Sequence, residues 1–331
     1  MDPRSVTIFE NNRAAVLNDA AHRFGFETGD LKKLGSFESF VYEYENNGQA
    51  YILKITHSLH RTKNSILGEL EWTNYLAAND VPVCRAIESK SGNLVEVIDV
   101  DGSYFLAYTV VKAPGQRIKS VNCRDSLIET WGQITGQMHA LAKDYTPSTE
   151  DKKRHHWYDD KAIVVENYLP VEQTMVIETA NQLKAKLRHY PTSRDDYGLI
   201  HSDLHQGNFF VDNGRMTVFD WDDCHYNWYA YDIAIPVLYM LLDSAIGQDN
   251  LEYASHFMSH FMDGYRRENL IDRFWMSKIP DFLKLREIDL YSIIYAEGAF
   301  EFNDWCRRYM DGRRQRIESH VPVIDLDFTK F

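Results

Sequence analysis

The hydrophobic pattern of this chain changes near residue 112, and this change constrains the fold more than any other feature. Before it, β-branched and aromatic residues dominate two hairpin-like stretches, SFVYEYENNGQAYILKI (39–55) and NLVEVIDVDGSYFLAYTVV (93–111). Their turn signals are Asn46-Asn47-Gly48 and Asp101-Gly102. The segment between them, TKNSILGELEWTNYLAAND (62–80), has a helical pattern. Together these elements predict a small α+β lobe.

The second part of the chain has a mainly helical pattern. The stretch KAPGQRI (112–118) contains Pro and Gly and predicts a linker near residues 110–117. Helical periodicity then covers residues 122–143, 161–189, 230–245, 251–267 and 284–310. A strand-like island at 199–220, with the turn DNG, interrupts it. We therefore predict an α+β, bilobal fold with a β-rich N-terminal lobe (1–112) and a larger, mainly helical C-terminal lobe (113–331).

Composition excludes several classes of protein. The 331 residues are 44% hydrophobic and 26% charged, which is typical of a folded globular protein. The net charge of −13 argues against nucleic-acid binding. The four cysteines form no C-x-x-C pair, and the longest apolar run, 233–242, is too short to span a membrane. We expect a cytoplasmic protein with no membrane partner and leave its oligomeric state open.

The strand-like island contains the stretch LIHSDLHQGNFF (199–210), which admits two readings. His201 and His205 have the spacing of a metal-binding pair on a helix, but a glycine follows and the segment precedes a hairpin, so we expect a loop. Asp203, Asn208 and Asp220 offer a different chemistry. A hairpin would return Asp220 towards the loop, and two carboxylates with an amide can orient a hydroxyl group and hold Mg²⁺ on phosphates. Each residue alone could simply cap a turn. The three together predict phosphoryl transfer.

The motif HSDLHQGNFF…VFDW resembles the catalytic loop and metal motif of the aminoglycoside phosphotransferase and choline kinase family, which has a protein-kinase-like fold. The family pattern is H-G-D-x-x-x-x-N followed by an apolar run and I-D-W. His201, Asp203, Asn208 and Asp220 match it, and Ser202 replaces the usual glycine. The resemblance extends over roughly residues 20 to 310.

This resemblance assigns roles to the matching residues. It implies that Asp203 is the catalytic base or the residue that orients the hydroxyl group, and that Asn208 and Asp220 are Mg²⁺ ligands. It implies that His201 braces the loop. His205 either faces the transferring phosphate or serves packing. The implied cofactors are ATP, with GTP not distinguished, and Mg²⁺.

The N-terminal lobe supplies weaker candidates for nucleotide binding. In kinases of this fold a strand lysine contacts the α and β phosphates and pairs with a helix glutamate. Lys54 within YILKI is that candidate, although a lysine at a strand end can also simply extend to solvent. Its expected partner is Glu69, since the resembling proteins begin the pattern E-x-x-W/F-x-x-x-L with this glutamate. Glu71 is the alternative.

Backbone groups complete the predicted nucleotide site. A phosphate-covering loop is expected around Gly35 and Ser36, with the amides of residues 36–39 approaching the phosphates. The hinge between the lobes is expected at 108–112, where Tyr108 and Val110 would lie beside the purine.

The phosphate acceptor is expected to be a small molecule. The segment after Asp220 leaves little room for a peptide platform, and the resemblance implies that Asp232 braces the catalytic loop. Asp222 and Asp223 either bind substrate or are simply solvated, and we favour a position of Asp222 near the metal.

Candidate acceptor residues come from the helical lobe. Glu297, Glu301 and Asp304 would share one face of the helix predicted over 284–310. HHWYDD (155–160) is a second aromatic and acidic cluster. Such groups suit a cationic amine, although a solvated face with Asp304 pairing Arg308 is an equal alternative.

These features predict an ATP-dependent phosphotransferase that acts on a hydroxyl group of a small molecule, such as an amino alcohol, an aminoglycoside-like sugar or an amino acid. The alternatives are a Ser/Thr protein kinase of the same superfamily and a nucleotide-binding pseudokinase scaffold.

Overall fold

The computed structural model describes residues 3–36, 39–100, 102–160 and 163–331. Three predicted features therefore lie partly outside the described residues: the tip of the phosphate loop (37–38), the turn residue Asp101, and the start of the helix predicted over 161–189. The chain forms two compact units. Unit 1 contains residues up to 115 together with 145–154 and 217–222, and unit 2 contains residues 116–144, 155–216 and 223–331.

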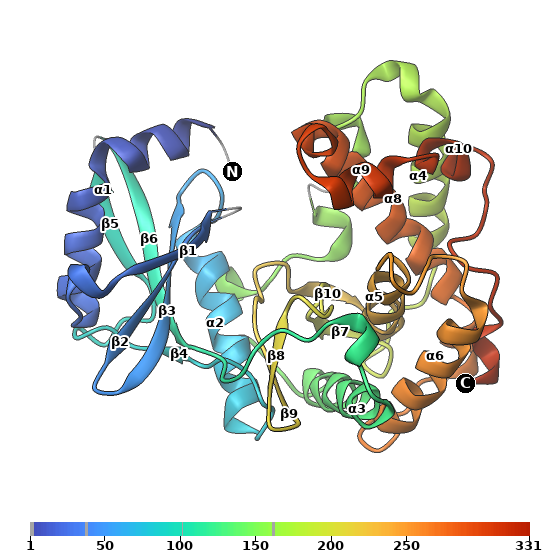
Figure 1. Ribbon diagram of the computed structural model, residues 1–331, viewed down its shortest axis with the longest axis horizontal. Helices are drawn as coiled ribbons and strands as arrows, with labels where there is room; N and C mark the ends of the chain where they lie inside the picture. The colour runs from blue at the N-terminus through green and yellow to red at the C-terminus, as the bar shows by residue number, and fades with distance from the viewer. Residues whose placement is uncertain (1–2, 37–38, 101, 161–162) are drawn as a thin grey trace. The chain divides into compact units, whose positions relative to one another are not determined.

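Unit 1 is built on an antiparallel sheet (Figure 1). Its strands are β1 (Lys32–Ser36), β2 (Phe40–Asn46), β3 (Gln49–His57), β4 (Ala86–Ile87), β5 (Glu96–Val100) and β6 (Ser103–Val111). The order is β1-β2-β3-β6-β4, and β5 also pairs with β6. The predicted β2–β3 turn is present, with Asn47 at φ 52° and Gly48 at φ 76°, as a tight hairpin turn requires.

Two helices cover the two faces of this sheet (Figure 1). Helix α1 (Pro3–Phe24) packs with Leu53 and Ile55 of β3 in one apolar core. Helix α2 (Lys63–Ala78) packs with Leu106 and Tyr108 of β6 in another. The alternation of side chains along the strands separates the two cores. The sequence predicted α2 and did not predict α1.

Unit 2 is mainly helical (Figure 1). Its helices are α3 (Asp125–Ala142), α4 (Thr174–Leu187), α5 (Tyr229–Leu241), α6 (Leu251–Tyr265), α7 (Arg273–Met276), α8 (Ile279–Glu297), α9 (Asp304–Met310) and α10 (Arg313–Glu318). Strand β7 (Tyr197–Ile200) pairs with β10 (His225–Trp228). Strand β8 (Phe209–Asp212) leads into the turn Asn213-Gly214, where both residues have positive φ, and then into β9 (Arg215–Val218).

Two helix predictions were wrong in extent. The helix predicted over 284–310 ends as α8 at Glu297, because Gly298 adopts the left-handed conformation (φ 61°) that terminates helices. A short 3-10 turn (Ala299–Glu301) and α9 follow it. The helix predicted over 161–189 begins only at Thr174.

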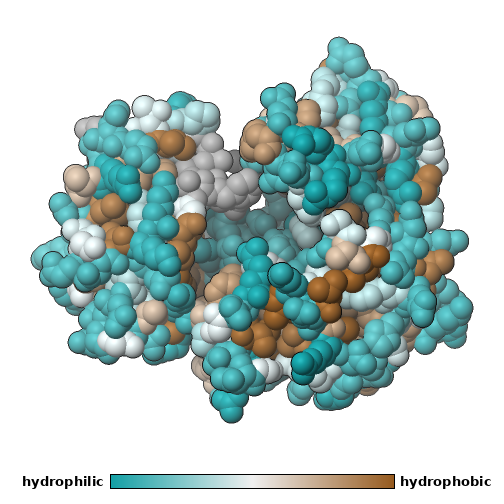
Figure 2. Space-filling view, viewed as in Figure 1, coloured by the Kyte–Doolittle hydropathy of each residue, from teal (hydrophilic) through white to brown (hydrophobic). Residues whose placement is uncertain are grey.

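No helix of the described residues combines the length and hydrophobicity needed to cross a bilayer. The face shown in Figure 2 is mostly hydrophilic, with hydrophobic residues in smaller areas.

Candidate active site

Lys54 lies in the middle of β3, where its backbone pairs with Val41 of β2 and Tyr108 of β6. Its neighbours Leu53 and Ile55 enter the core under α1. Because side chains alternate along a strand, Lys54 points to the opposite face of the sheet. The pairing of β3 therefore fixes the position of Lys54 along the strand and the face of the sheet to which its side chain points.

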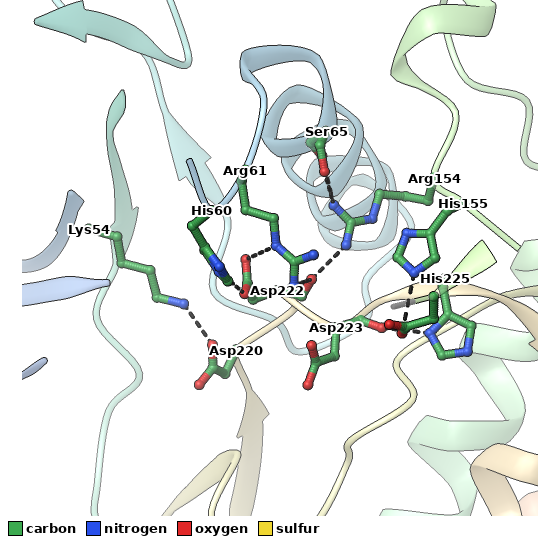
Figure 3. A network of polar contacts seen from close by, with 11 residues as sticks. Lys54, His60, Arg61, Ser65, Arg154, His155, Asp220, Asp222, Asp223 and His225 are labelled. Carbon is green, nitrogen blue, oxygen red and sulfur yellow. Dashed lines mark hydrogen bonds and ion pairs between the residues drawn. The ribbon is translucent and has the colours of Figure 1, made fainter. Parts of the chain in front are cut away.

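The Lys54 ammonium group binds Asp220 within unit 1, with Nζ 2.7 Å from Oδ1 (Figure 3). Burial alone would lower the pKa of Lys54, but the surrounding negative groups, Asp220 first among them, together outweigh burial and raise this pKa well above its ordinary value. The aspartate is 47% exposed. It has φ 69°, a conformation that residues other than glycine rarely adopt and that is often found at functional sites.

Asp222 anchors the segment that carries Asp220. Arg61 donates to its carboxylate through Nη2 at 3.0 Å, and His60 Nε2 lies 3.3 Å from the same carboxylate (Figure 3). Arg154 Nη2 donates to the backbone carbonyl of Asp222 at 2.6 Å. Sequence reasoning placed Asp222 near the metal and missed both arginines, because contacts between residues so far apart in sequence leave no local pattern.

The two glutamates considered as partners of Lys54 have different environments. Glu71 lies 2.5 Å from the Lys152 ammonium group. Glu69 is buried, and burial, reinforced by the charge of Asp222 and opposed by that of Lys54, raises its pKa to about 7. Within the described part of the chain its Oε2 has no hydrogen-bond partner. Of the two glutamates, Glu69 is therefore the one whose pKa is affected by the charge of Lys54. The ion pair of Lys54 itself is with Asp220.

The remaining predicted nucleotide residues lie on strands of unit 1. Gly35 and Ser36 end β1 opposite Val41 and Phe40, next to a register shift. Tyr108 is buried, and Val110 pairs with Ala86 and Ile52. The adjacent amides, those of residues 111 and 112, donate to the carbonyl groups of residues 85 and 50.

The catalytic-loop sequence of unit 2 follows β7 and is held by Asp232. The Asp232 carboxylate accepts hydrogen bonds from the backbone amides of His201 (3.1 Å) and Ser202 (2.8 Å). His139 Nε2 lies 3.1 Å from the same carboxylate. Ser202, which stands where the resembling family has glycine, adopts φ 72°. The serine therefore takes up the backbone conformation that glycine would adopt without strain.

Asp203 is held as an anion by groups of unit 2. Arg286 of α8 donates through Nη2 to its Oδ1, and His205 Nε2 lies 3.4 Å from its Oδ2. Burial alone would raise the pKa of Asp203, but the charge of Arg286 together with the contributions of His205 and His201 outweighs burial and holds this pKa at about 2. Arg286 also donates to Tyr239 Oη at 2.8 Å. Sequence reasoning missed Arg286, which lies 83 residues from Asp203.

Asn208 is oriented by Asp203. Its amide nitrogen donates to the Asp203 backbone carbonyl at 2.9 Å and to Oδ2 at 3.1 Å. These two bonds use the amide nitrogen and leave the amide oxygen as the acceptor side of the group. The Asn208 amide oxygen in unit 2 and, separately, the Asp220 carboxylate in unit 1 are hard oxygen donors of the kind that Mg²⁺ prefers.

The predicted acceptor residues do not share a helix face. Glu297 ends α8, whereas Glu301 and Asp304 follow the break at Gly298, and all three carboxylates are exposed. Asp304 pairs with Arg307 at 2.7 Å, one position before the predicted partner.

The cluster at 155–160 lies in unit 2. His155 Nε2 lies 3.5 Å from Asp160 Oδ2, and His156 Nδ1 lies 2.8 Å from Tyr197 Oη. Sequence reasoning also missed Asp289, a buried carboxylate on α8.

The chain is similar in sequence to known phosphotransferases. Residues 30–268 match the model of the family described as "Phosphotransferase enzyme family". Amicoumacin kinase of Bacillus subtilis (strain 168) is 37% identical over 319 residues, covering 95% of this chain and 94% of that protein.

Two solved structures are also similar. The first, "Amicoumacin kinase hAmiN in complex with AMP-PNP, Ca2+ and Ami", has a TM-score of 0.91 at 36% identity and covers 96% of this chain and 97% of that one. A microcompartment-associated aminopropanol kinase has a TM-score of 0.75 at 21% identity, covering 93% and 97%, and shares the fold.

Proposed function

Because the chain belongs to the phosphotransferase enzyme family and is an ATP-dependent kinase of a small-molecule hydroxyl group, we propose that its acceptor is amicoumacin or a closely similar compound. The observation that carries this proposal is the 37% identity to amicoumacin kinase across 95% of the chain. The TM-score of 0.91 to the complex with AMP-PNP, Ca²⁺ and Ami supports it.

We propose that Asp203 orients the acceptor hydroxyl group. The oxygen of this group forms a bond to the γ-phosphorus as the bond from the γ-phosphorus to the bridging oxygen of ADP breaks, and the hydroxyl proton passes to Asp203 or to solvent. A carboxyl group with a pKa of about 2 is a weak base, so it acts mainly by accepting a hydrogen bond and placing the nucleophile. Phosphoryl transfer with a loose transition state requires little more from this residue.

We propose that Lys54 binds the α and β phosphates, and that Asn208 and Asp220 hold Mg²⁺. When bound, the ion neutralises the charge that builds up on the phosphate oxygens. Lys54 approaches the phosphates from the face of β3 that carries its ammonium group, and Asp222 with Arg61 keeps the Asp220 segment in place.

The test is a kinase assay on the purified protein with Mg-ATP and amicoumacin. ADP release and a product heavier by one phosphoryl group are the expected results. A panel of amino alcohols, hydroxylysine, homoserine and a generic protein substrate is run in parallel. Transfer to a panel member with none to amicoumacin would overturn the proposed acceptor.

Variants separate the proposed roles. Asp203→Asn is expected to lower kcat by roughly 10²–10⁴-fold while nucleotide binding persists. The exposed Asp195→Asn is the matched control. In calorimetry, Asp220→Asn should weaken Mg²⁺-dependent nucleotide binding more than His201→Asn does, and the reverse order would contradict the metal assignment.

A further inference from the structure

A cluster of three metal-binding side chains lies on the surface of unit 2, on α3 and α6. Asp125 begins α3, and His256 and His260 stand one turn apart on α6. His256 Nε2 lies 2.8 Å from Asp125 Oδ1, and His260 Nε2 lies 3.5 Å from Asp125 Oδ2. The three potential ligand atoms all lie within 4.8 Å of one another. Both His256 and His260 therefore point their Nε2 atom at the carboxylate of Asp125.

The backbone beneath this cluster is held by close packing of α3 against α6. A Cβ atom on Gly132 would lie 1.9 Å from the carbonyl oxygen of Phe261, and one on Gly264 would lie 1.9 Å from that of Glu129. Only glycine permits helices to approach so closely. The positions from which the three side chains project are thus fixed by the fold before any ligand binds.

A further carboxylate orients one of the histidines. Glu129 Oε1 lies 3.3 Å from His260 Nδ1, and Arg267 holds the other oxygen of Glu129. A hydrogen bond from Nδ1 to a carboxylate fixes the ring and leaves Nε2 as a ligand, the arrangement found behind most metal-binding histidines.

We propose that Asp125, His256 and His260 bind a divalent transition-metal ion, with Zn²⁺ the best fit, and that this ion links α3 to α6. Zinc accepts imidazole nitrogen and carboxylate oxygen at about 2.0–2.2 Å, so ligand atoms in a tetrahedral site lie ~3.3 Å apart. The distances from the two histidines to the Asp125 carboxylate, one to each of its oxygens, are 2.8 and 3.5 Å and lie on either side of this value. Three protein ligands leave the fourth position to water.

A second cluster, His155, Asp160 and His225, serves as a comparison. Both ring nitrogens of His225 already have partners, with Nδ1 2.9 Å from the Asp223 carbonyl oxygen and Nε2 3.0 Å from the Asn227 amide nitrogen (Figure 3 shows the first of these). A metal at this second cluster would have to break a bond from His225 to a group that is not one of the three candidate ligands. At the α3–α6 cluster, the contacts that a metal would replace, those of His256 and His260 with Asp125, join the candidate ligands themselves.

The test is calorimetric titration of the chelator-treated full-length protein with ZnCl₂, together with Tm measured with and without Zn²⁺. We expect binding of one Zn²⁺ and a rise in Tm. Both effects should be lost in the His256→Gln/His260→Gln variant and retained in His155→Gln. Glu129→Gln should weaken the affinity about 10-fold, because it removes the support of His260.

Two results would overturn the proposal. Zinc uptake that is unchanged in the double histidine variant, or no zinc binding by the wild-type protein at micromolar concentration, would leave the cluster as ion pairs only. Far-ultraviolet circular dichroism and kinase activity with Mg-ATP verify that the double variant is folded.

Discussion

Replacing Asp289 with asparagine is expected to stabilise the protein at pH 8. Asp289 lies on α8, one turn after Arg286, and is 5% exposed. Its Oδ1 has no hydrogen-bond partner among the residues that the structure describes. Burial raises the pKa of this carboxyl group to about 7, although the charge of Arg286 acts in the opposite direction. The folded protein therefore holds at pH 8 a buried anion that is incompletely compensated.

The magnitude follows from the difference between the folded and unfolded pKa values. The ordinary value is 3.8 and the folded value is about 7, a difference of about 3. At 1.36 kcal/mol for each pKa unit, ionisation of Asp289 costs the folded state up to ~4 kcal/mol. Because the folded pKa is raised, the contribution of Asp289 to stability is fully present below about pH 4 and is lost as pH rises through 7. Asparagine does not ionise, so the expected gain at pH 8 is ~2–4 kcal/mol, with the lower figure allowing for the cost of burying the amide.

Urea denaturation of wild type and Asp289→Asn at pH 5 and pH 8 tests this reasoning. The stability difference between the two proteins should grow from pH 5 to pH 8, since the charge appears only in the wild type. Asp203→Asn is the matched control of opposite sign. The pKa of Asp203 in the folded protein is about 2, below its ordinary value of 3.8. The Asp203 carboxylate therefore stabilises the folded protein above about pH 4, and this stabilisation is lost as pH falls through 2. This variant should be less stable than wild type at both pH values. A difference for Asp289→Asn that does not change with pH would refute the argument.

Three further predictions rest on single contacts. Ser202→Gly relieves a left-handed backbone at φ 72° and should raise the free energy of unfolding by ~1 kcal/mol in urea, whereas a loss of stability would contradict the strain argument. Gly132→Ala should lower Tm, because its Cβ would lie 1.9 Å from the carbonyl oxygen of Phe261, and an unchanged Tm would mean that the helices separate without cost. For Glu69, whose pKa burial raises to about 7, kcat/KM of the wild type should rise as pH passes 7 and the carboxylate forms beside Lys54. Glu69→Gln should abolish this rise, and a flat wild-type profile would argue against a catalytic contribution of the anion.

Much of the fold was predictable because its signals are local. The hairpin turn at Asn47-Gly48 and the turn at Asn213-Gly214 were found where the residues that tolerate positive φ occur, and all four have it. The α+β protein-kinase-like fold, the family resemblance and the small-molecule kinase activity are confirmed by the comparisons. A catalytic motif concentrated in about twenty residues leaves a strong signal even where the rest of the chain diverges.

The features that were missed or wrong depend on contacts between distant residues or on one backbone angle. Helical periodicity continues through Gly298, so only its left-handed conformation reveals that Glu297 and Glu301 are not on one helix. Helix α1 was not predicted, and the structure shows that it packs through Phe9, Val16 and Ala20 on the sheet. Nothing in the sequence around Arg286 distinguishes it from other charged residues of a helix, and its role follows only from its contact with Asp203 in the folded protein.

The two carboxylates central to the proposed chemistry are each neutralised by a cation of their own unit. Lys54 pairs with Asp220 in unit 1, and Arg286 pairs with Asp203 in unit 2. For Asp203, which is 17% exposed, the pairing offsets part of the cost of burying its charge, whereas Asp220 is 47% exposed and is also in contact with solvent. Lys54 occupies Oδ1 of Asp220, so a divalent cation bound as proposed would compete with Lys54 for this oxygen, and nucleotide phosphates would offer Lys54 another partner. Nucleotide and cation should therefore increase each other's affinity. Binding of either one separates Lys54 from Asp220, so the other no longer has to break this ion pair.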